Sequence, residues 1–205
     1  MLGILLFIMS AALLLTAVNG LTQHSYLIAL LSGAVWAFIL YCLCARGKLR
    51  MPASADTGKT ALLLTLLCAA VNLAWVLAVR IEPFSDYETY WRTACALAFV
   101  GDIDAPWYIA MYPHILGCST FLSAFLKIFG EHVMVAAVIN VILTCLSGLL
   151  IYGICLRLAS PLTAALAYLL WIVCPSKLML DPLVFSEPLY TCLILLFFYL
   201  IVLIE

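Results

Sequence analysis

Residues 133–156 read VMVAAVINVILTCLSGLLIYGICL, an apolar run without a charged side chain that ends directly before Arg157. A membrane-spanning helix needs about twenty consecutive apolar residues, so this run is long enough to cross a bilayer. Inside hydrocarbon every backbone amide must be satisfied within the protein, which leaves helices or a closed barrel. The run does not alternate between apolar and polar residues, and it therefore predicts a helix and not a barrel strand.

The composition of the whole chain agrees with this interpretation. Of its 205 residues, 68% are hydrophobic and only 9% are charged, whereas soluble domains are closer to half apolar and a quarter charged. The formal net charge is −1, which excludes the basic surface typical of nucleic-acid-binding proteins. We therefore predict an all-α polytopic membrane protein with about six transmembrane helices, for which the lipid bilayer is a partner and nucleic acid is not.

Further apolar runs surround the opening stretch. The first one lacks a basic segment before it and a good cleavage site after it, which favours a retained helix over a signal peptide. The cysteines within the runs behave as small hydrophobes, and the Cys42–Cys44 spacing is not that of a metal site. The runs are Leu2–Val18, Tyr26–Cys44, Ala61–Val79, Ile115–Phe129, Leu162–Val173 and Leu183–Ile204.

The positions of the basic residues predict which segments of the chain face the cytoplasm. The densest basic stretch, residues 46–50, lies between the second and third runs, and the positive-inside rule predicts that it is cytoplasmic. The segment that begins at Arg80 is then outside. We divide the chain into residues 1–59, two leading transmembrane helices with a basic cytoplasmic loop, and residues 60–205, a transmembrane core with an outer loop over residues 80–131.

The outer loop is predicted to be structured. Its residues 80–113 contain half of the acids in the chain, and seven aromatic residues lie between Phe84 and Tyr108. A short helix over Phe84–Phe99, lying along the membrane surface with its aromatic rings at headgroup level, fits this pattern. A solvated acidic loop is the alternative, although the aromatic content argues against a flexible linker.

One run leaves the topology open. Ile115–Phe129 has about fifteen residues, which is short for the roughly twenty that a spanning helix needs. If it crosses the membrane, the segment 175–187 is cytoplasmic; if it is a surface or re-entrant helix, that segment lies outside with Asp86. The length of the run favours the second alternative.

Ionisable residues at membrane depth or in tight outer loops are candidates for function, because each must find a partner or carry a cost. Asp86 is placed to act as a general base toward an acceptor hydroxyl or amine, or it caps the surface helix. Glu88 and Arg92 are its neighbours. Glu187 either occupies the favoured first turn of the last helix or points into a cavity of the bundle.

A second group of candidates comes from the segment before the last helix and from the outer loop. Lys177 can meet a phosphate as a point charge, or it is a lysine whose ammonium reaches the interface from a helix end. Asp181 belongs to the same polar segment. We expect His114, next to Pro113, to place its polar ring at the membrane interface.

The order of these features resembles a known family. An outward helix is followed by Ser85-Asp86-Tyr87-Glu88-Thr89-Tyr90, then by Tyr112-Pro113, a long helix that ends at Arg157, a short helix that ends at Pro175, and Phe185-Ser186-Glu187-Pro188-Leu189-Tyr190. This arrangement, over roughly residues 62–205, is similar to the N-terminal part of GT-C integral-membrane glycosyltransferases of the protein-mannosyltransferase and aminoarabinose-transferase type.

The resemblance implies an enzyme that moves a sugar from a polyprenyl-phosphate carrier to a glycan, lipid or protein acceptor on the outer face. Members of the family usually have more spanning helices, so we expect a partial chain. It implies that Asp86 is the catalytic base, with Glu88 beside it. It also implies a carrier-phosphate site near Lys177 and Glu187, to which we add Arg92, His114 and Asp181 as candidates.

The resemblance further implies a bacterial plasma membrane location with the site facing outside. Some relatives use a divalent cation, Mg or Mn, which Asp86, Asp102 and Asp104 are candidates to hold. Two other functions stay open from the residues alone: a non-catalytic membrane subunit that binds a lipid carrier, and a small transporter in which Asp86, Asp181 and Glu187 handle protons or ions.

Overall fold

The structure is a computed structural model that describes residues 56–101, 103 and 106–204. The regular elements in these ranges are all helices, as predicted. In chain order they are α3 (Thr57–Ala78), α4 (Asp86–Cys95), the short π-helix η1 (Ala96–Val100), α5 (Pro106–Met111), α6 (Pro113–Phe129), α7 (Val133–Leu158), α8 (Pro161–Ile172), α9 (Pro175–Leu180) and α10 (Glu187–Ile204).

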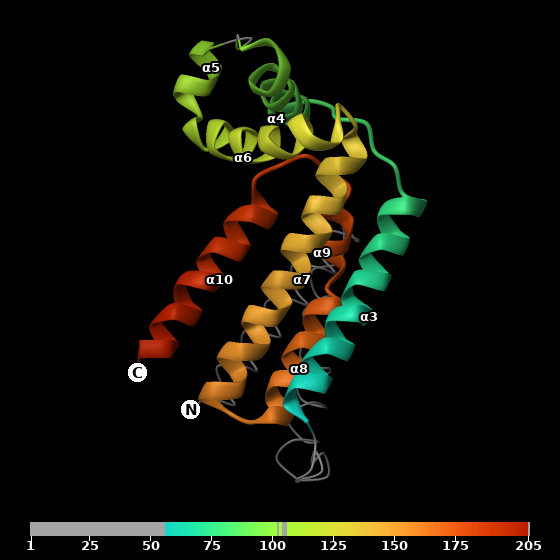
Figure 1. Cartoon of the computed structure of the whole chain (residues 1–205), viewed down its shortest axis with the longest axis vertical. Helices are drawn as coiled ribbons and strands as arrows, with labels where there is room; N and C mark the ends of the chain where they lie inside the picture. Colours follow the sequence, from blue (N-terminus) through green and yellow to red (C-terminus); the bar gives the residue numbers. More distant parts are fainter. Residues whose placement is uncertain (1–55, 102, 104–105, 205) are drawn as a thin grey trace, which may run out of the picture.

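A bundle of long helices forms the body of the molecule. Helices α3, α7, α8 and α10 lie along its long axis, and α7 packs against each of the other three (Figure 1). In the described ranges three helices, α3, α7 and α10, are long and apolar enough to cross a membrane. The chain is thus a membrane protein by length and composition of its helices. The six spans expected from the sequence are not confirmed, because residues 2–18 and 26–44 lie outside the described residues and α6 and α8 are shorter.

Three helices gather at one end of the bundle, and we call α4, α5 and α6 the cap. Helix α6 crosses the end of the bundle instead of running alongside it, and α4 packs on α6 (Figure 1). This arrangement agrees with the alternative in which residues 115–129 do not span. It leaves the start of α10 at the same end of the bundle as the start of α4.

Local sequence explains where several helices begin and end. The Oδ1 atom of Asp56 accepts hydrogen bonds from the backbone N–H groups of Gly58 and Lys59 at the start of α3, which satisfies amides that a helix leaves unpaired. Ser160 does the same for Thr163 in α8. Helix α6 ends at Gly130, whose φ of 88° lies in the left-handed region that glycine adopts without strain.

The last apolar run begins before its helix does. The sequence predicted a continuous run over Leu183–Ile204, whereas α10 begins at Glu187. Residues 181–186, which we call the strap, connect α9 to α10 without forming a helix, and residues 181–185 are buried. The strap is apolar because it is covered by other elements, so hydropathy alone did not separate it from the helix.

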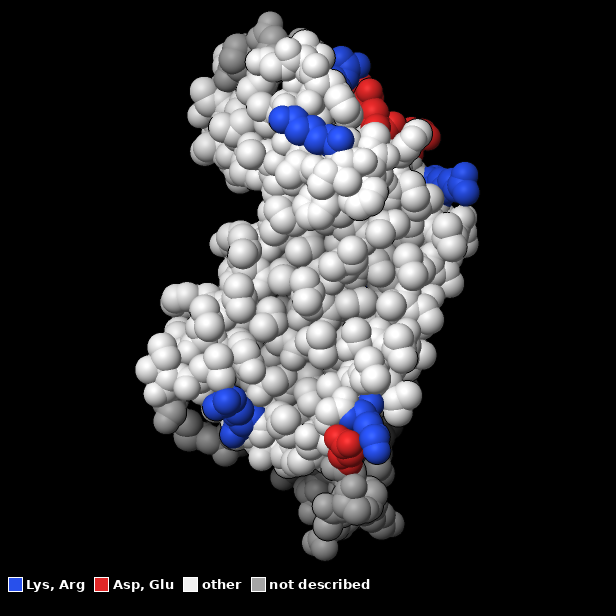
Figure 2. Space-filling model, in the orientation of Figure 1, with Lys and Arg blue, Asp and Glu red and all other residues white. Residues whose placement is uncertain are grey.

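Two groups of buried side chains form the core. One joins the cap to the upper part of α7 and to the strap, and it includes Ile115, Leu122 and Phe185. The other lies between α3, α7 and α8, where Gly148 permits a close approach: a Cβ atom at this position would lie 2.1 Å from the Tyr168 ring. On the face drawn in Figure 2, the charged side chains lie at the two ends of the molecule and the middle is uncharged, as expected for a surface in contact with lipid.

Candidate functional site

The cap and the start of α10 bring together a group of polar side chains that we call the outer cluster: Asp86, Tyr90, Tyr108, Ser186 and Glu187. Asp86 is the first residue of α4 and is exposed. The Tyr108 hydroxyl, from α5, donates a hydrogen bond to Oδ1 of Asp86 at 3.1 Å. A carboxylate that accepts one hydrogen bond and stays open to solvent keeps free lone pairs for a proton.

A chain of hydroxyls connects α4 to α10. The Tyr90 hydroxyl lies 3.2 Å from Oγ of Ser186, and this Oγ donates to Oε2 of Glu187 at 3.3 Å. Tyr90 is one helical turn after Asp86, so both side chains lie on the same face of α4. Residues from the first outer segment and from the segment before α10 therefore share one site.

The two tyrosines of the outer cluster are held in their protonated forms. Burial raises the pKa of Tyr90, and the charges of Glu187 and Asp86 raise it further against the opposing effect of the Ser186 hydrogen bond. The hydrogen bond to Asp86 raises the pKa of Tyr108. At neutral pH both phenols are thus hydrogen-bond donors next to carboxylates, and neither acts as a base.

The backbone is strained directly before Asp86. Ser85 has a φ of 52°, in the left-handed region where side chains other than glycine are rare and cost on the order of 1–3 kcal/mol. Its side chain makes no capping hydrogen bond to α4, and Asp86, which the sequence allowed as the cap, is instead the first residue of the helix. The strained residue determines the direction in which the chain enters α4 and hence the placement of Asp86.

Three further predicted residues lie on the cap, Glu88 and Arg92 on the face of α4 opposite Asp86 and Tyr90, and His114 beside Tyr90. Glu88 and Arg92 form an ion pair within α4, with Nη2 of Arg92 2.6 Å from Oε1 of Glu88 and Nε donating to the same oxygen. This pairing occupies Glu88, whereas Asp86 has no cationic partner within salt-bridge distance among the described residues. His114, at the start of α6, is exposed, and its ring centroid lies 6.1 Å from that of Tyr90.

Lys177 and Asp181 lie elsewhere, inside the bundle. Nζ of Lys177 donates to Oδ1 of Asn72 on α3 at 2.7 Å and lies 5.8 Å from the centre of the Trp171 ring. Oδ1 of Asp181 accepts from the Thr144 hydroxyl at 2.9 Å. We call Asn72, Thr144, Lys177 and Asp181 the inner cluster.

The inner cluster is deeply placed. Asn72 lies about 9 Å from the outer end of α3 and Thr144 about 16 Å from the outer end of α7, at a rise of about 1.5 Å per residue. Asp181 is 1% exposed, and its Oδ2 has no hydrogen-bond partner among the described residues. The structure therefore separates Lys177 and Asp181 from the outer cluster, where Glu187 lies with Asp86.

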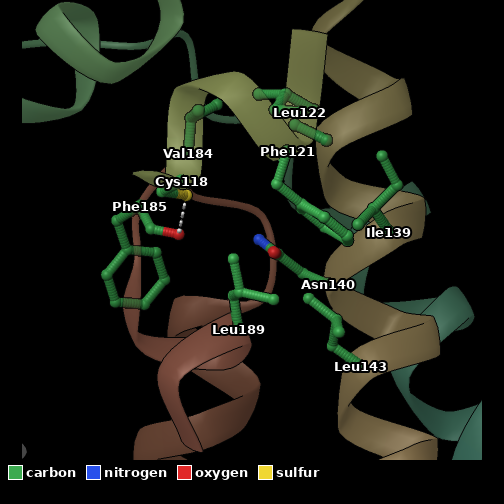
Figure 3. Close-up of a pocket in the computed structure, with 10 residues that line it drawn as sticks. Cys118, Phe121, Leu122, Ile139, Asn140, Leu143, Val184, Phe185 and Leu189 are labelled. Carbon is green, nitrogen blue, oxygen red and sulfur yellow. Dashed lines mark hydrogen bonds between the residues drawn. The ribbon is translucent and has the colours of Figure 1, made fainter. Parts of the chain in front are cut away.

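A small apolar pocket of about 20 Å³, room for about one water molecule, adjoins the strap. Figure 3 shows Asn140 reaching from α7 toward the strap between the apolar side chains of the pocket. Its wall includes Phe185, which directly precedes Ser186 of the outer cluster, and the Sγ of Cys118 donates to the carbonyl oxygen of Phe185 at 3.4 Å. The remaining lining residues are Phe121, Leu122, Ala136, Ile139, Leu143, Val184 and Leu189.

The described residues do not form a metal site. No group of three or more His, Cys, Asp or Glu side chains among them is arranged to hold a metal ion. Of the three predicted ligands, Asp86 is described, whereas Asp102 and Asp104 lie outside the described residues. The metal site therefore stays a prediction, and we derive no chemistry from it.

Several residues of both clusters were not assigned to a site from the sequence. Tyr90 was interpreted as a headgroup aromatic, although its spacing from Asp86 places the two side chains on one helix face. Asn72 and Asn140 are isolated amides within apolar runs, and a buried amide in a membrane protein needs a hydrogen-bond partner. The requirement of a buried amide for a partner could therefore have identified both asparagines from the sequence.

Neither a protein-family model, nor a curated protein, nor a solved structure matches this chain.

Proposed function

We propose that this chain is a GT-C-like glycosyltransferase, or part of one, that moves a sugar from a polyprenyl-phosphate carrier to an acceptor on the outer face of a bacterial plasma membrane. The observation that carries the proposal is the meeting of Asp86 and Glu187 around Tyr90 at one end of the bundle. An exposed carboxylate at the boundary between the bundle and its cap is where a soluble acceptor and a lipid-held donor can meet.

Asp86 is the base in the proposed reaction. An acceptor hydroxyl transfers its proton to the free oxygen of Asp86 as its own oxygen forms a bond to the anomeric carbon of the sugar. The bond between that carbon and the carrier phosphate breaks, and its electron pair stays with the phosphate. The hydrogen bond from Tyr108 holds the carboxylate in place, which keeps the base oriented toward the acceptor.

Glu88 is less suited to this role than Asp86. Both nitrogen contacts of Arg92 fall on Oε1 of Glu88, so the guanidinium already occupies this carboxylate. His114 lies next to Tyr90 of the outer cluster, so we assign the departing phosphate to it. Arg92 lies on the opposite face of α4 from Asp86 and Tyr90 and pairs with Glu88. Lys177 is bonded to Asn72 inside the bundle and has no part in this assignment.

The lipid part of the donor requires an apolar surface. The pocket between α6, α7 and α10 is lined almost wholly by apolar side chains and reaches Phe185, next to the outer cluster. At about 20 Å³ the pocket is too small for an isoprenoid chain, so the chain would lie in the bilayer against the outside of the bundle, with its phosphate near the start of α10. The Glu187 carboxylate would repel the carrier phosphate, so we place Glu187 on the sugar side of the site.

The test is sugar transfer by the full chain in membranes, with polyprenyl-phosphate mannose and polyprenyl-phosphate aminoarabinose as labelled donors. Asp86→Asn should lower transfer by about 10²- to 10⁴-fold, the contribution of a general base, at unchanged protein level. Glu82→Gln, an exposed acid outside the outer cluster, is the matched control and should retain transfer. Retained transfer by Asp86→Asn would show that the base is assigned wrongly.

The same experiment separates the enzyme from a carrier-binding subunit. If the unaltered chain binds both donors and transfers neither sugar, the non-catalytic alternative is correct. A second assay measures free polyprenyl phosphate released from the donor, and it detects turnover when water is the only acceptor present.

One observation favours a second candidate, a small transporter. Lys177 and Asp181 lie among the apolar helices of the bundle, and Asp181 is buried with an oxygen that has no partner among the described residues. Ionisable residues inside transmembrane bundles often serve proton or ion pathways. The purified chain in liposomes would then support proton or cation flux that Asp181→Asn abolishes and Asp86→Asn leaves unchanged. Absence of flux together with sugar transfer would reject this alternative.

A further inference from the structure

The backbone carbonyl groups of the strap need hydrogen-bond partners from other parts of the protein. Residues 181–186 form no helix or strand, although Asp181, Leu183, Val184 and Phe185 are buried. Carbonyl groups that are buried away from water must be satisfied by other parts of the protein. The question for the strap is therefore which side chains supply those hydrogen bonds.

Cys118 of α6 donates to the Phe185 carbonyl, and two side chains of α7 bond to the start of the strap, Asn140 to its backbone and Thr144 to the Asp181 side chain. Nδ2 of Asn140 donates to the carbonyl oxygens of Asp181 at 3.1 Å and of Leu183 at 2.7 Å. The Thr144 hydroxyl donates to Oδ1 of Asp181 at 2.9 Å. Asn140 and Thr144 are one helical turn apart and thus lie on the same face of α7.

The chemistry of the two side chains matches the requirement. A primary amide has two N–H donors, and both donors of Asn140 are used on strap carbonyls. Asn140 is 6% exposed and Thr144 is 3% exposed, so water does not replace either residue as a donor. The strap is held to α7 by this pair at its start and reaches Tyr90 at its end.

We propose that Asn140 and Thr144 are positioning residues for the outer cluster: they hold the strap in the one path that brings Ser186 and Glu187 to Tyr90 and Asp86. Neither side chain has a contact with the outer cluster itself, and both act through the strap. The inference rests on the proposed function for its catalytic consequence, whereas the placement of the strap is measurable without any reaction.

The experiment uses the full chain in detergent and in membranes. Thr144→Val keeps the side-chain volume and removes the donor, Thr144→Ser keeps the donor, and Asn140→Leu removes both amide donors. Ser147→Ala is the matched control, because Ser147 is equally buried on α7 and has no hydrogen bond to the strap. Each variant is measured by hydrogen–deuterium exchange of peptides covering residues 181–190 and by kcat and KM of sugar transfer.

For Thr144→Val and Asn140→Leu we expect exchange in the strap to become about 10- to 100-fold faster, the effect of losing a hydrogen bond to a charged or buried acceptor. We expect kcat to fall by about 10²-fold, the effect of a displacement of about 1 Å, while KM for the donor changes little. Thr144→Ser and Ser147→Ala should behave like the unaltered chain in both assays.

Two results would overturn the proposal. One is strap exchange that stays unchanged in Thr144→Val and Asn140→Leu; the other is exchange that rises equally over α3 and α8, which indicates general loosening of the bundle. If Asn140→Leu does not fold, the proposal is tested by comparing exchange in the strap between Thr144→Val and Thr144→Ser. Absence of sugar transfer in the unaltered chain would contradict the proposed function alone, since the exchange measurements still test the hold on the strap.

Discussion

The hydroxyl of Tyr90 lies 3.2 Å from Oγ of Ser186, although the two residues are 96 positions apart in the sequence. Tyr90 belongs to the cap, whereas Ser186 ends the strap that leads into α10. This contact is the point at which the two polar segments noticed in the sequence become one site. It also defines the first test of the outer cluster.

Tyr90→Phe should weaken the site without unfolding it. The change removes the hydroxyl that joins α4 to Ser186 and keeps the buried ring, so we expect a loss of about 1 kcal/mol in the free energy of unfolding, the usual net value of a hydrogen bond. Sugar transfer should fall by about tenfold. Tyr190→Phe, at an exposed tyrosine of α10, is the matched control for loss of a phenol. Equal transfer by both variants would contradict a role for Tyr90.

Ser85→Gly should stabilise the protein. Ser85 has a φ of 52°, and glycine adopts positive φ without the steric cost of a Cβ atom, which is about 1–2 kcal/mol. Part of this gain is offset because glycine loses more freedom on folding. Thermal unfolding in detergent should show a higher Tm for Ser85→Gly and no gain for Ser85→Ala. A lower Tm for the glycine variant would show that the Ser85 backbone is not strained.

Gly148→Ala should disrupt the packing of α7 on α8. The added Cβ would lie 2.1 Å from a carbon of the Tyr168 ring, so the ring or the helix must move, at a cost of about 1–3 kcal/mol. Gly117→Ala is the control, because a Cβ there meets no atom within 4 Å. Unfolding in detergent should begin at a lower temperature for Gly148→Ala only.

Cys95 should react slowly with alkylating reagents. Burial raises the pKa of its thiol from 9.0 to about 12, with a hydrogen bond to Glu131 and the Glu131 charge contributing. Only the thiolate reacts, so at pH 8 alkylation by iodoacetamide should be about 10³-fold slower than for an unperturbed thiol. Peptide mass spectrometry against time gives the rate.

Glu131→Gln should accelerate the same reaction, because it removes the charge that favours the protonated thiol. The sign follows from the raised pKa: the protonated thiol is the form that the fold stabilises, so the folded state resists deprotonation as pH rises. A rate for Cys95 equal to that of an unfolded control peptide would contradict the assignment.

Labelling from one side of the membrane should test the arrangement of the cap. Cysteines introduced at Glu82 and Glu187 should react with an impermeant maleimide added outside intact cells, whereas one at Arg157 should react only after the membrane is opened. Glu82 and Glu187 are exposed near the cap, and Arg157 is exposed at the other end of α7. Reaction of Glu187→Cys only from the inside would place α10 the other way round and separate it from Asp86.

The sequence by itself determined the class of protein and the helices that form the body of the bundle. The runs that became α3, α7 and α10 are apolar over the length of a bilayer, and a backbone in lipid has to satisfy its own hydrogen bonds. The same local rules predicted the cap helix that begins near Asp86 and the position of Glu187 at a helix start, because helix ends depend on residues close in sequence.

Only the tertiary structure decided which polar residues share a site. Lys177 and Asp181 read as outer-loop residues, yet they point into the bundle and bond to Asn72 and Thr144. The length of the run that became α6 favoured a helix that does not cross the membrane, but only the structure shows that it lies across the end of the bundle. Both outcomes depend on contacts between residues far apart in the chain, where packing and hydrogen-bond satisfaction across helices outweigh local pattern.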